Sequence, residues 1–554
     1  MRKRFAILTI EVVKIATYTE GEETKEGWKM DDKRIIPYSA LYEAYLKDES
    51  RTVGQADSIS FPAGEEEVRA VLRALPVHVP VTVQGARTGL AAAAVPRGGH
   101  ILNLGRMDAV TALRQEGEKF YVTVQPGVVL LNLRKMVARR EFDTAGWSEE
   151  SLAALEAMRR GPELFFPTDP TETTAALGGM AACNASGARS YRYGAMRGHV
   201  MALRCVLADG RTVALRRGQY RADGLRFSLP TVEGGAVEGM LPDYVMPRTK
   251  NASGYYVAPD MDLIDLFIGS DGTLGVITQL ELELLPMPKV NWGVTVFLPC
   301  EEAACRYAEA VRQQADCAAA IEYFNPYALE ILRVQRQRGG VFACLPDLAV
   351  AGGGAAVFVE LHCAAEAEAM AALALLGQLC CDCGGNAENS WVARTESECE
   401  TLHHFRHAVP ESVNSIIDER KRQYAGITKM GSDMSVPDGR LLEVTEMYRR
   451  TLAEEGFEYA SWGHIGNNHI HVNILPRDME EHARAKQLFR RWADTVSRMG
   501  GAVSAEHGVG KLKAPFLTIM YGEEHIRQMR ELKRCFDPDF RLGRGNLFAV
   551  EDEA

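Results

Sequence analysis

Three glycine-bearing turns in the first half of the chain constrain its fold more than any other feature. They read GARTGL at 85–90, GGMAACNASG at 178–187 and GSDGTLG at 269–275, each beside a predicted strand. Any one of them, taken alone, is typical of a tight hairpin turn. Glycine also lets successive backbone N–H groups approach an anion, so three such turns in one region indicate a pocket for a phosphate-bearing cofactor. The region lacks both the G-x-G-x-x-G of a dinucleotide-binding unit and the G-K-[ST] of a P-loop.

The segments around these turns alternate between helix and strand patterns. Residues 65–75, EEEVRAVLRAL, place Val68, Leu72 and Leu75 on one helical face. VMALRCVLADGRTVALRRG predicts a hairpin with Asp209 and Gly210 at its tip. Strand segments joined by turns are predicted in PVTVQGARTGL, HILNLGRMDAV, KFYVTVQPGVVLLNL and DLFIGSDGTLGVITQLELELLP.

A boundary is expected near residue 287, where LLPMP ends the last of these strands. NWGVTVFLP and AAVFVELHC then alternate with helical segments, which predicts an α+β second domain. A chain of 554 residues is also too long for one core.

Composition excludes some classes of protein. A net charge of −11 argues against nucleic-acid binding, which usually needs a basic face. Neither MRKRFAILTIEVVKIATY nor AAEAEAMAALALLGQL predicts a signal peptide or a membrane span, because charged residues interrupt both. Cys380, Cys381 and Cys383 cluster without a well-spaced fourth metal ligand, so we expect reduced thiols.

Residues 461–476, SWGHIGNNHIHVNILP, hold three histidines within eight positions. A surface loop running into a strand explains this stretch, and so does half of a metal site. His469 and His471 are two residues apart, so in a strand both would face the same side. The residues alone leave both interpretations open.

Five motifs in order resemble those of the flavoproteins related to vanillyl-alcohol oxidase and p-cresol methylhydroxylase, in the D-lactate and D-2-hydroxyglutarate dehydrogenase branch. They are QGARTGLAAAAVPRGGHILNLGRMDAV, FFPTDPTETTAALGGMAACNASGARSYRYGAMRGHV, FIGSDGTLGVITQLELELLP, GHIGNNHIHVNI and GGAVSAEHGVGKLKAPFL. The resemblance covers most of residues 45–550. It implies a two-lobed α+β flavoprotein with a bipartite PCMH-type FAD-binding lobe and an α+β substrate cap. The implied division is an N-terminal extension at 1–54, the FAD-binding domain at 55–286, the cap at 287–499 and a segment returning to the FAD lobe at 500–554.

The resemblance implies FAD as the cofactor. The loop at 85–90 lacks the histidine that links flavin in covalent relatives, so we expect the FAD to be noncovalent. The residues expected to bind FAD are Gly85, Ala86, Arg87, Thr88, Gly89, Leu90, Pro167, Asp169, Gly178, Gly179, Asn184, Gly187, Gly269, Ser270, Gly272, Thr273, Gly275, Val276 and Ile277.

The resemblance also answers the histidine question. His464, His471 and Glu506 match the metal ligands of the family, which implies a divalent metal, Zn or Mn. His469 becomes an outer residue or an alternative ligand.

His507 matches a base that would take the substrate hydroxyl proton, although it could instead be a structural histidine at a glycine turn. Arg406 in FRHAVPESV matches a carboxylate-binding arginine, and Lys429 is a second candidate, in a segment whose spacing varies in the family. A solvated surface charge is the alternative for both.

Three stretches depart from the family pattern. Gln84-Gly85-Ala86 stands where Arg-Gly-Gly is usual. Gly466-Asn467-Asn468-His469 replaces G-D-G-N, and Gly543-Arg544-Gly545 replaces a closing Asn-Pro-Gly. These changes bear on the substrate more than on the fold or the cofactor.

The implied reaction is oxidation of a D-2-hydroxy acid to the 2-oxo acid, with the hydride passing to flavin N5. The alternatives are an enzyme resembling the alkyl-dihydroxyacetonephosphate synthases and an FAD-binding subunit of a glycolate oxidase-type complex. No ferredoxin-like cysteine run is present, so we expect a separate electron acceptor: electron-transfer flavoprotein, an iron–sulfur protein or quinone. We expect a cytoplasmic protein, with attachment to the inner face of the membrane or a homodimer as further options.

Overall fold

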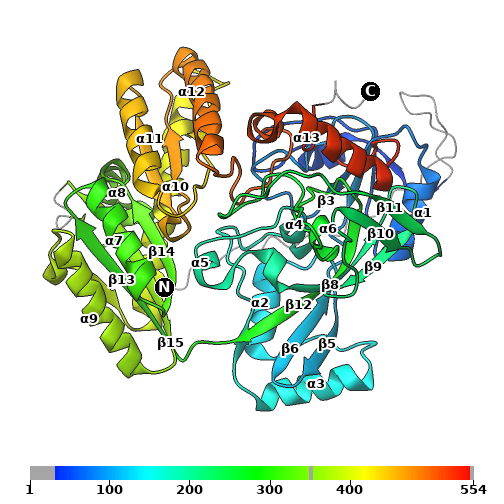
Figure 1. Ribbon diagram of the computed structural model, residues 1–554, viewed down its shortest axis with the longest axis horizontal. Coiled ribbons are helices and arrows are strands. Elements are labelled where there is room, and N and C mark those ends of the chain that lie inside the picture. Colours follow the sequence, from blue (N-terminus) through cyan, green and yellow to red (C-terminus); the bar gives the residue numbers. More distant parts are fainter. Residues whose placement is uncertain (1–31, 349–352, 550–554) are drawn as a thin grey trace.

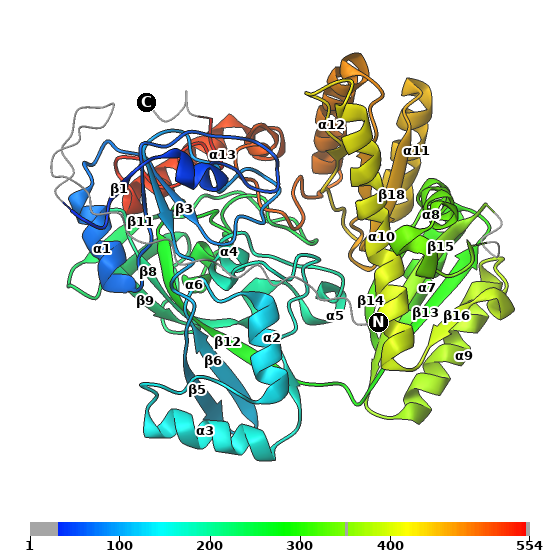
Figure 2. The ribbon, with the colours of Figure 1, turned by 180° about the vertical axis from the view of Figure 1, so that it is seen from behind.

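The computed structural model describes residues 32–348 and 353–549, which form two lobes joined by a short coil at residues 287–289 (Figures 1 and 2). Most of the predicted N-terminal extension, including MRKRFAILTIEVVKIATY, lies outside the described residues. The C-terminal helix α13 (Ala514–Phe536) packs on the first lobe, beside segments far from it in sequence.

The first lobe contains two sheets and a hairpin. The smaller sheet has the order β1-β2-β4-β3, and β2, β4 and β3 are parallel. The larger antiparallel sheet has the order β5-β6-β12-β8-β9, with β7 paired to β12. The strands are β1 (Ile36–Pro37), β2 (Ser58–Ser60), β3 (Val81–Gln84), β4 (His100–Asn103), β5 (Val110–Glu116), β6 (Lys119–Val124), β7 (Leu164–Phe165), β8 (Val200–Val206), β9 (Thr212–Arg216), β10 (Arg226–Pro230), β11 (Ala236–Met240) and β12 (Val276–Pro286).

Helices of the first lobe are short, and several flank the glycine turns. They are α1 (Glu65–Ala74), α2 (Leu130–Arg139), α3 (Glu149–Arg160), α4 (Leu177–Ala182), α5 (Ser190–Tyr193) and α6 (Ile264–Phe267). The turn at 178–187 therefore begins inside α4, and the turn at 269–275 joins α6 to β12.

The second lobe, the cap, is built on an antiparallel sheet of order β16-β13-β15-β14-β18-β19-β17. Its strands are β13 (Val290–Leu298), β14 (Ala318–Phe324), β15 (Ala355–Cys363), β16 (Trp391–Ala393), β17 (Met430–Gly431), β18 (Tyr459–Gly463) and β19 (His471–Ile474). Its helices are α7 (Glu301–Gln314), α8 (Pro326–Arg338), α9 (Glu366–Asp382), α10 (Glu396–Lys421), α11 (Leu441–Glu455) and α12 (Met479–Arg498).

Helices cover both faces of the cap sheet. On one face α7 and α9 pack against β13 and β15, and on the other α8 and α10 pack around Phe297, Phe324 and Phe358 (Figures 1 and 2). Burying a strand on both faces favours the continuous apolar runs seen in NWGVTVFLP and AAVFVELHC. The α+β fold predicted from the sequence is confirmed.

Most predicted elements are present. Helix α1 buries Val68, Leu72 and the following Leu75, as its helical spacing predicts. Strands β8 and β9 form the predicted hairpin around Asp209 and Gly210.

Two predicted strand segments are helices instead. VVLLNL enters α2, because Leu130, Leu133 and Val137 share one helical face that packs into the core. DLFI forms most of α6, whose first turn is favoured by the Asp262 carboxylate accepting a hydrogen bond from the Ile264 N–H at 3.4 Å.

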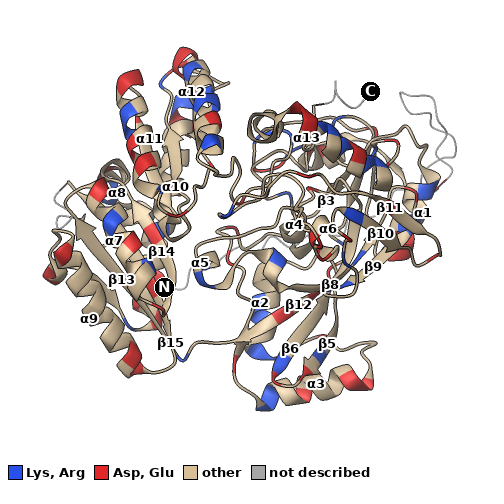
Figure 3. Ribbon diagram, in the orientation of Figure 1, with Lys and Arg blue, Asp and Glu red and all other residues tan. Residues whose placement is uncertain are grey.

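Charges of both signs are mixed along the exposed helices α11, α12 and α13 (Figure 3). Within the described ranges, every helix is too short or too polar to span a bilayer.

Candidate active site

A cavity in the first lobe is lined by all three glycine turns and by the returning C-terminal segment. The first loop contributes Gly85 to Leu90, and the third contributes Ser270, Gly272, Gly275 and Ile277. Gly178 and Gly179 lie at the cavity from the start of α4, and Glu506 and His507 close it from the returning segment. The turns therefore converge on one space, as an extended anionic cofactor would require.

The remaining residues expected to bind FAD lie behind this lining. Asp169 pairs with the Arg134 guanidinium at 3.0 Å, and the Asn184 carboxamide accepts a hydrogen bond from the Arg197 N–H at 3.0 Å. The Thr273 hydroxyl lies 2.8 Å from the Tyr255 hydroxyl. The cavity lining likewise does not include Pro167, Gly187, Gly269 or Val276.

The close approach of two segments explains one of the glycines. A Cβ on Gly178 would lie 2.4 Å from the Pro126 Cβ, whereas a Cβ on Gly179 would meet no protein atom within 4 Å. The first glycine lets α4 pack against the segment after β6, and the second leaves open space at the cavity. This open, backbone-lined surface fits a bound FAD.

Arg87 is the cationic side chain of the first loop. Its backbone is left-handed, with φ of 60°, and its guanidinium carbon lies 4.3 Å above the Tyr45 ring. Burial lowers the pKa of the Arg87 guanidinium. An ordered guanidinium at the cavity fits the negative charge of a pyrophosphate.

The third loop holds the returning segment in place. The Asp271 carboxylate accepts hydrogen bonds from the N–H groups of Val509 at 2.9 Å and Gly510 at 2.7 Å. The Lys511 ammonium donates to the carbonyls of Ala92 and Ala93 beside the first loop. These contacts place Glu506 and His507 at the cavity.

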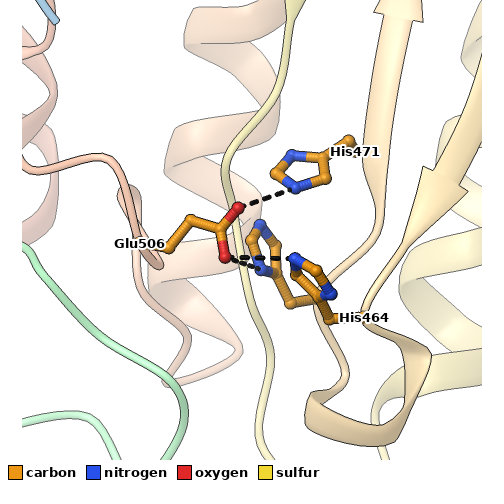
Figure 4. A group of neighbouring side chains, drawn as sticks. His464, His471 and Glu506 are labelled. Atoms are coloured by element: carbon orange, nitrogen blue, oxygen red, sulfur yellow. Dashed lines mark hydrogen bonds and ion pairs between the residues drawn. The ribbon is translucent and has the colours of Figure 1, made fainter. Parts of the chain in front are cut away.

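Glu506 brings two of the predicted ligand histidines together (Figure 4). One carboxylate oxygen, Oε1, lies 3.1 Å from His471 Nε2, and the other, Oε2, lies 3.1 Å from His464 Nε2. His464 follows β18 and His471 begins β19, so a tight turn within the cap sheet sets the spacing of the two rings. The three residues predicted as metal ligands therefore converge.

Partners on the far side of each ring orient these histidines. His464 Nδ1 lies 2.7 Å from Glu322 Oε1, and His471 Nδ1 lies 3.0 Å from the Ser432 carbonyl. Metal-bound imidazoles show this arrangement, because the outer N–H donates to a carboxylate or carbonyl while the inner nitrogen faces the metal. The donor set fits a divalent first-row metal.

Electrostatics at the cluster keep Glu506 ionised. Burial alone would raise the pKa of Glu506, but Lys250 and His464 outweigh it and hold the pKa well below the usual range. Burial alone would lower the pKa of His464, but the Glu322 and Glu506 carboxylates outweigh it and raise the pKa. Buried Lys250 donates to Glu506 Oε2 at 2.6 Å.

His507 lies on the cavity side of the same cluster. Its Nε2 is 3.3 Å from Glu506 Oε1, its Nδ1 is 3.4 Å from Asp433 Oδ2, and its ring stacks on His471 at 5.4 Å. Its side chain is 28% exposed, compared with 9% for Glu506. An imidazole oriented by a carboxylate and open to a cavity can act as a general base.

Arg406 joins the site and Lys429 does not. Arg406 Nε in α10 lies 3.8 Å from Glu322 Oε2, on the carboxylate that orients His464. Lys429 precedes β17, in which Met430 pairs with Ile474, the last residue of β19. Because His471 is the first residue of β19, Lys429 lies near the opposite end of that strand. Burial lowers the pKa of Lys429 to about 8.

Sequence reasoning missed three charged side chains of the site, Lys250, Glu322 and Asp433. Asp433 opens the DMSVP element, and its oxygens lie near Lys513, Ser504, His469 and His507. The acidic residue that opens this element was its only local signal. The pairs that define the other two span 142 and 256 residues of chain, so no local pattern reveals them.

The cysteines at 380–383 do not form a candidate metal site. Cys380 is buried in α9 whereas Cys381 is exposed, and within the described residues this cluster is absent from the groups able to hold a metal.

Comparison with known proteins agrees with this architecture. Residues 56–145 and 150–216 match a model described as an FAD binding domain, and residues 287–547 match the C-terminal domain of FAD linked oxidases. A D-lactate dehydrogenase of Anaerostipes hadrus is 27% identical over 93% of this chain and 94% of its own length. A D-2-hydroxyglutarate dehydrogenase of Xanthomonas citri pv. viticola is 26% identical over 89% of this chain and 90% of its own length.

The solved structure of p-cresol methylhydroxylase with substrate bound has a TM-score of 0.61 at 15% identity, over 94% of each chain. This likeness shows a shared fold, which includes the PCMH-type FAD-binding lobe. With its FAD binding domain in the first lobe and the oxidase C-terminal domain in the cap and returning segment, the chain belongs to the FAD-linked oxidases.

Proposed function

We propose that the enzyme oxidises a D-2-hydroxy acid to the 2-oxo acid, using noncovalent FAD and one divalent metal. The observation that carries the proposal is that Glu506 and His507 line the same cavity as the glycine turns, while Glu506 also joins the two histidines of the cap. The relatives named D-lactate and D-2-hydroxyglutarate dehydrogenase support the substrate class.

The residues divide the work between two sides of the cavity. When bound, FAD would accept the hydride at N5, and the metal would favour ionisation of the substrate hydroxyl as a Lewis acid. Gly85–Leu90, Gly178, Gly179 and Ser270–Ile277 would hold the cofactor. His464, His471 and Glu506 would hold the metal, with zinc or manganese fitting the donors.

His507 would take the hydroxyl proton. Its ring is exposed to the cavity, and Asp433 lies beside its other nitrogen. Arg406 would bind the substrate carboxylate, because a guanidinium grips a carboxylate through two parallel hydrogen bonds. Arg406 Nε lies 3.8 Å from Glu322 Oε2, longer than a hydrogen bond. Lys429 would serve only if the segment before β17 moved toward His471.

We also propose the domain division at 54, 286 and 499. Strand β12 ends at Pro286 and β13 begins at Val290, so the connection between the lobes is short. The cysteines identified as free thiols fit a reducing compartment, which supports a cytoplasmic enzyme. Electrons would leave to a separate electron-transfer flavoprotein, iron–sulfur protein or quinone.

Anaerobic titration of the purified flavoprotein tests the proposal. D-lactate, D-2-hydroxyglutarate and glycolate are added separately, with the L-enantiomers as controls, and flavin bleaching is followed. Bleaching by at least one D-acid or by glycolate, but not by L-acids, is expected. A flavin that none of these acids reduces would favour ether exchange, as in the alkyl-dihydroxyacetonephosphate synthases, or a non-catalytic FAD-binding subunit.

A further inference from the structure

We propose that His469 is a third imidazole ligand of the metal, so that the site is His464, His469, His471 and Glu506. This inference rests on the metal in the proposed function and extends its ligand set. The four residues each offer a ligand atom, and these atoms all lie within 4.8 Å of one another.

The inner nitrogen of His469 faces the carboxylate that joins the other two rings. His469 Nδ1 lies 3.9 Å from Glu506 Oε2, and its ring centroid is 5.4 Å from His464 and 4.3 Å from His471. Ligand atoms of a tetrahedral zinc site are about 3.3 Å apart, given zinc–nitrogen bonds of about 2.0 Å. The His464 and His471 contacts to Glu506, both 3.1 Å, match that spacing, and His469 would sit at a wider angle.

Leaving His469 Nδ1 buried without a partner would cost free energy. The His469 side chain is 0% exposed, and neither of its ring nitrogens, Nδ1 or Nε2, makes a hydrogen bond of good geometry among the described residues. Buried polar atoms are almost always satisfied in native proteins, and a site for a bound ion is one reason for an exception. A cation placed between His469 Nδ1 and Glu506 Oε2 would satisfy both atoms.

The outer nitrogen completes the pattern found at the other two rings. His469 Nε2 lies 3.1 Å from Asp433 Oδ1, as His464 Nδ1 lies near Glu322 and His471 Nδ1 near the Ser432 carbonyl. All three rings thus have one nitrogen toward Glu506 and the other toward a carboxylate or carbonyl. This is the arrangement that fixes metal-bound imidazoles.

The turn between β18 and β19 places His469 for this role. Asn468 adopts a left-handed backbone with φ of 51°, and its side chain is held by Arg312 at 2.8 Å and Asp438 at 2.8 Å. The His469 N–H then donates to the His464 carbonyl at 3.2 Å. The backbone of the turn thus holds His469 on the Glu506 side, and ligation requires closing the 3.9 Å gap between His469 Nδ1 and Glu506 Oε2.

His507 is the rival for a third imidazole, because its Nε2 lies 3.3 Å from Glu506 Oε1. The two rings differ in what they face. His507 lines the cofactor cavity, whereas His469 is absent from the cavity lining and lies behind Glu506. Ligation by His469 therefore leaves the cavity side of the metal open to substrate and leaves His507 free to move a proton.

X-ray absorption of the zinc-loaded, flavin-containing full-length protein counts the imidazoles directly. Three are expected in the wild type and in His507→Asn, and two in His469→Asn. His78→Asn, at an exposed histidine, is the matched control and should keep three. Competition with a chromophoric chelator should show zinc bound at least about 10-fold more weakly by His469→Asn than by His78→Asn.

Two imidazoles in wild-type protein would overturn the inference and leave the proposed function standing. Three imidazoles in wild type and in His469→Asn, but two in His507→Asn, would assign the ligand to His507 and also overturn it. Wild-type protein that binds no zinc would contradict both the inference and the metal in the proposed function. Three imidazoles in a protein whose flavin no 2-hydroxy acid reduces would contradict only the proposed reaction.

Discussion

Neighbouring residues in this site have different tasks. Glu506 is nearly buried and divides its two oxygens among His464, His471 and Lys250, while the next side chain, His507, opens to the cofactor cavity. Asp433 supports both segments, because it lies beside His469 and His507 and accepts from the Lys513 ammonium at 2.5 Å. Each of these two carboxylates contacts more than one histidine ring, so a change at one ring should alter the electrostatic surroundings of the others.

His507→Asn should leave FAD bound but slow flavin reduction by about 10²–10⁴-fold, because the substrate hydroxyl would lose its proton acceptor. Stopped-flow measurement of anaerobic flavin bleaching checks this, with His525→Asn, at a histidine on α13, as the control. Unchanged reduction kinetics would remove His507 from the mechanism.

Arg406→Met should weaken binding of 2-hydroxy acids by about 1.5–3 kcal/mol, the scale of a charge-assisted hydrogen bond. Binding of the 2-oxo acid product, followed by the flavin spectrum, avoids turnover. Arg491→Met, at an exposed arginine that pairs with Glu455, is the control and should bind as the wild type does. Equal affinities for Arg406→Met and wild type would place the carboxylate site elsewhere.

Elements of the first lobe meet through close backbone approaches and buried polar groups. Gly178 at the start of α4 touches Pro126 after β6, and His100 in β4 contacts Ser58 in β2 with its Nδ1 2.8 Å from the hydroxyl. These contacts join segments next to the glycine turns. Substitutions at a close contact should affect the stability of the lobe, whereas substitutions facing the cavity should affect cofactor binding.

Gly178→Ala should destabilise the protein by about 1–3 kcal/mol with or without FAD, because the new methyl group overlaps Pro126. Gly179→Ala meets open space in the protein, so it should leave the FAD-free protein as stable as the wild type and weaken only FAD binding. Urea unfolding of FAD-free protein and FAD titration separate the two effects. Equal FAD affinity in Gly179→Ala and wild type would move the cofactor away from this glycine.

His100 predicts acid sensitivity of the first lobe. Burial, followed by repulsion from Arg541, lowers the pKa of His100 to about 3. The unfolded chain binds a proton near pH 6.5 and the folded protein does not, so stability falls as the pH drops from about 6.5 toward 3.

The contribution of His100 should be about 1.4 kcal/mol per pH unit within this window. Urea unfolding at pH 7, 6 and 5 should show a shallower pH dependence in His100→Gln than in the wild type. The variant starts less stable at pH 7, because Ser58 loses its ring partner. Parallel pH dependences would show that His100 does not titrate in this way.

Both lobes of the molecule contribute residues to the site. The cofactor loops belong to the first lobe, the histidines to cap strands, and Glu506 to the segment that returns from the cap to the first lobe. Arg189 at α5 crosses the gap to Glu360 in β15 at 2.7 Å, and the Tyr193 hydroxyl lies 2.7 Å from His362. These two contacts thus hold the lobes together.

Removal of the metal should therefore abolish activity without releasing FAD. Chelated protein, or His471→Ala, should keep its FAD and fold, but a 2-hydroxy acid should no longer reduce the flavin. Adding zinc or manganese should restore the chelated wild type but not the variant, and metal analysis should find about one ion per chain. Full activity in protein shown to be metal-free would contradict the metal site.

The amino-acid sequence by itself determined the local elements and the chemistry of the loops. Turn residues and hydrophobic spacing predicted the hairpin at Asp209 and Gly210, helix α1 and the strands of the cap, because these patterns depend on neighbours a few residues away. The motifs around Gly85, His464 and Glu506 likewise contained the residue types that a flavin and a metal require.

Only the tertiary structure decided which charges meet. Glu322, Lys250 and Asp433 pair with the site through contacts between distant segments, and Arg406 joins it while Lys429 does not. Helices α2 and α6 also replaced predicted strands, because short apolar runs fit either element until packing selects one. Such pairings depend on how the strands of the cap and the returning segment align in space, and local sequence carries no record of that alignment.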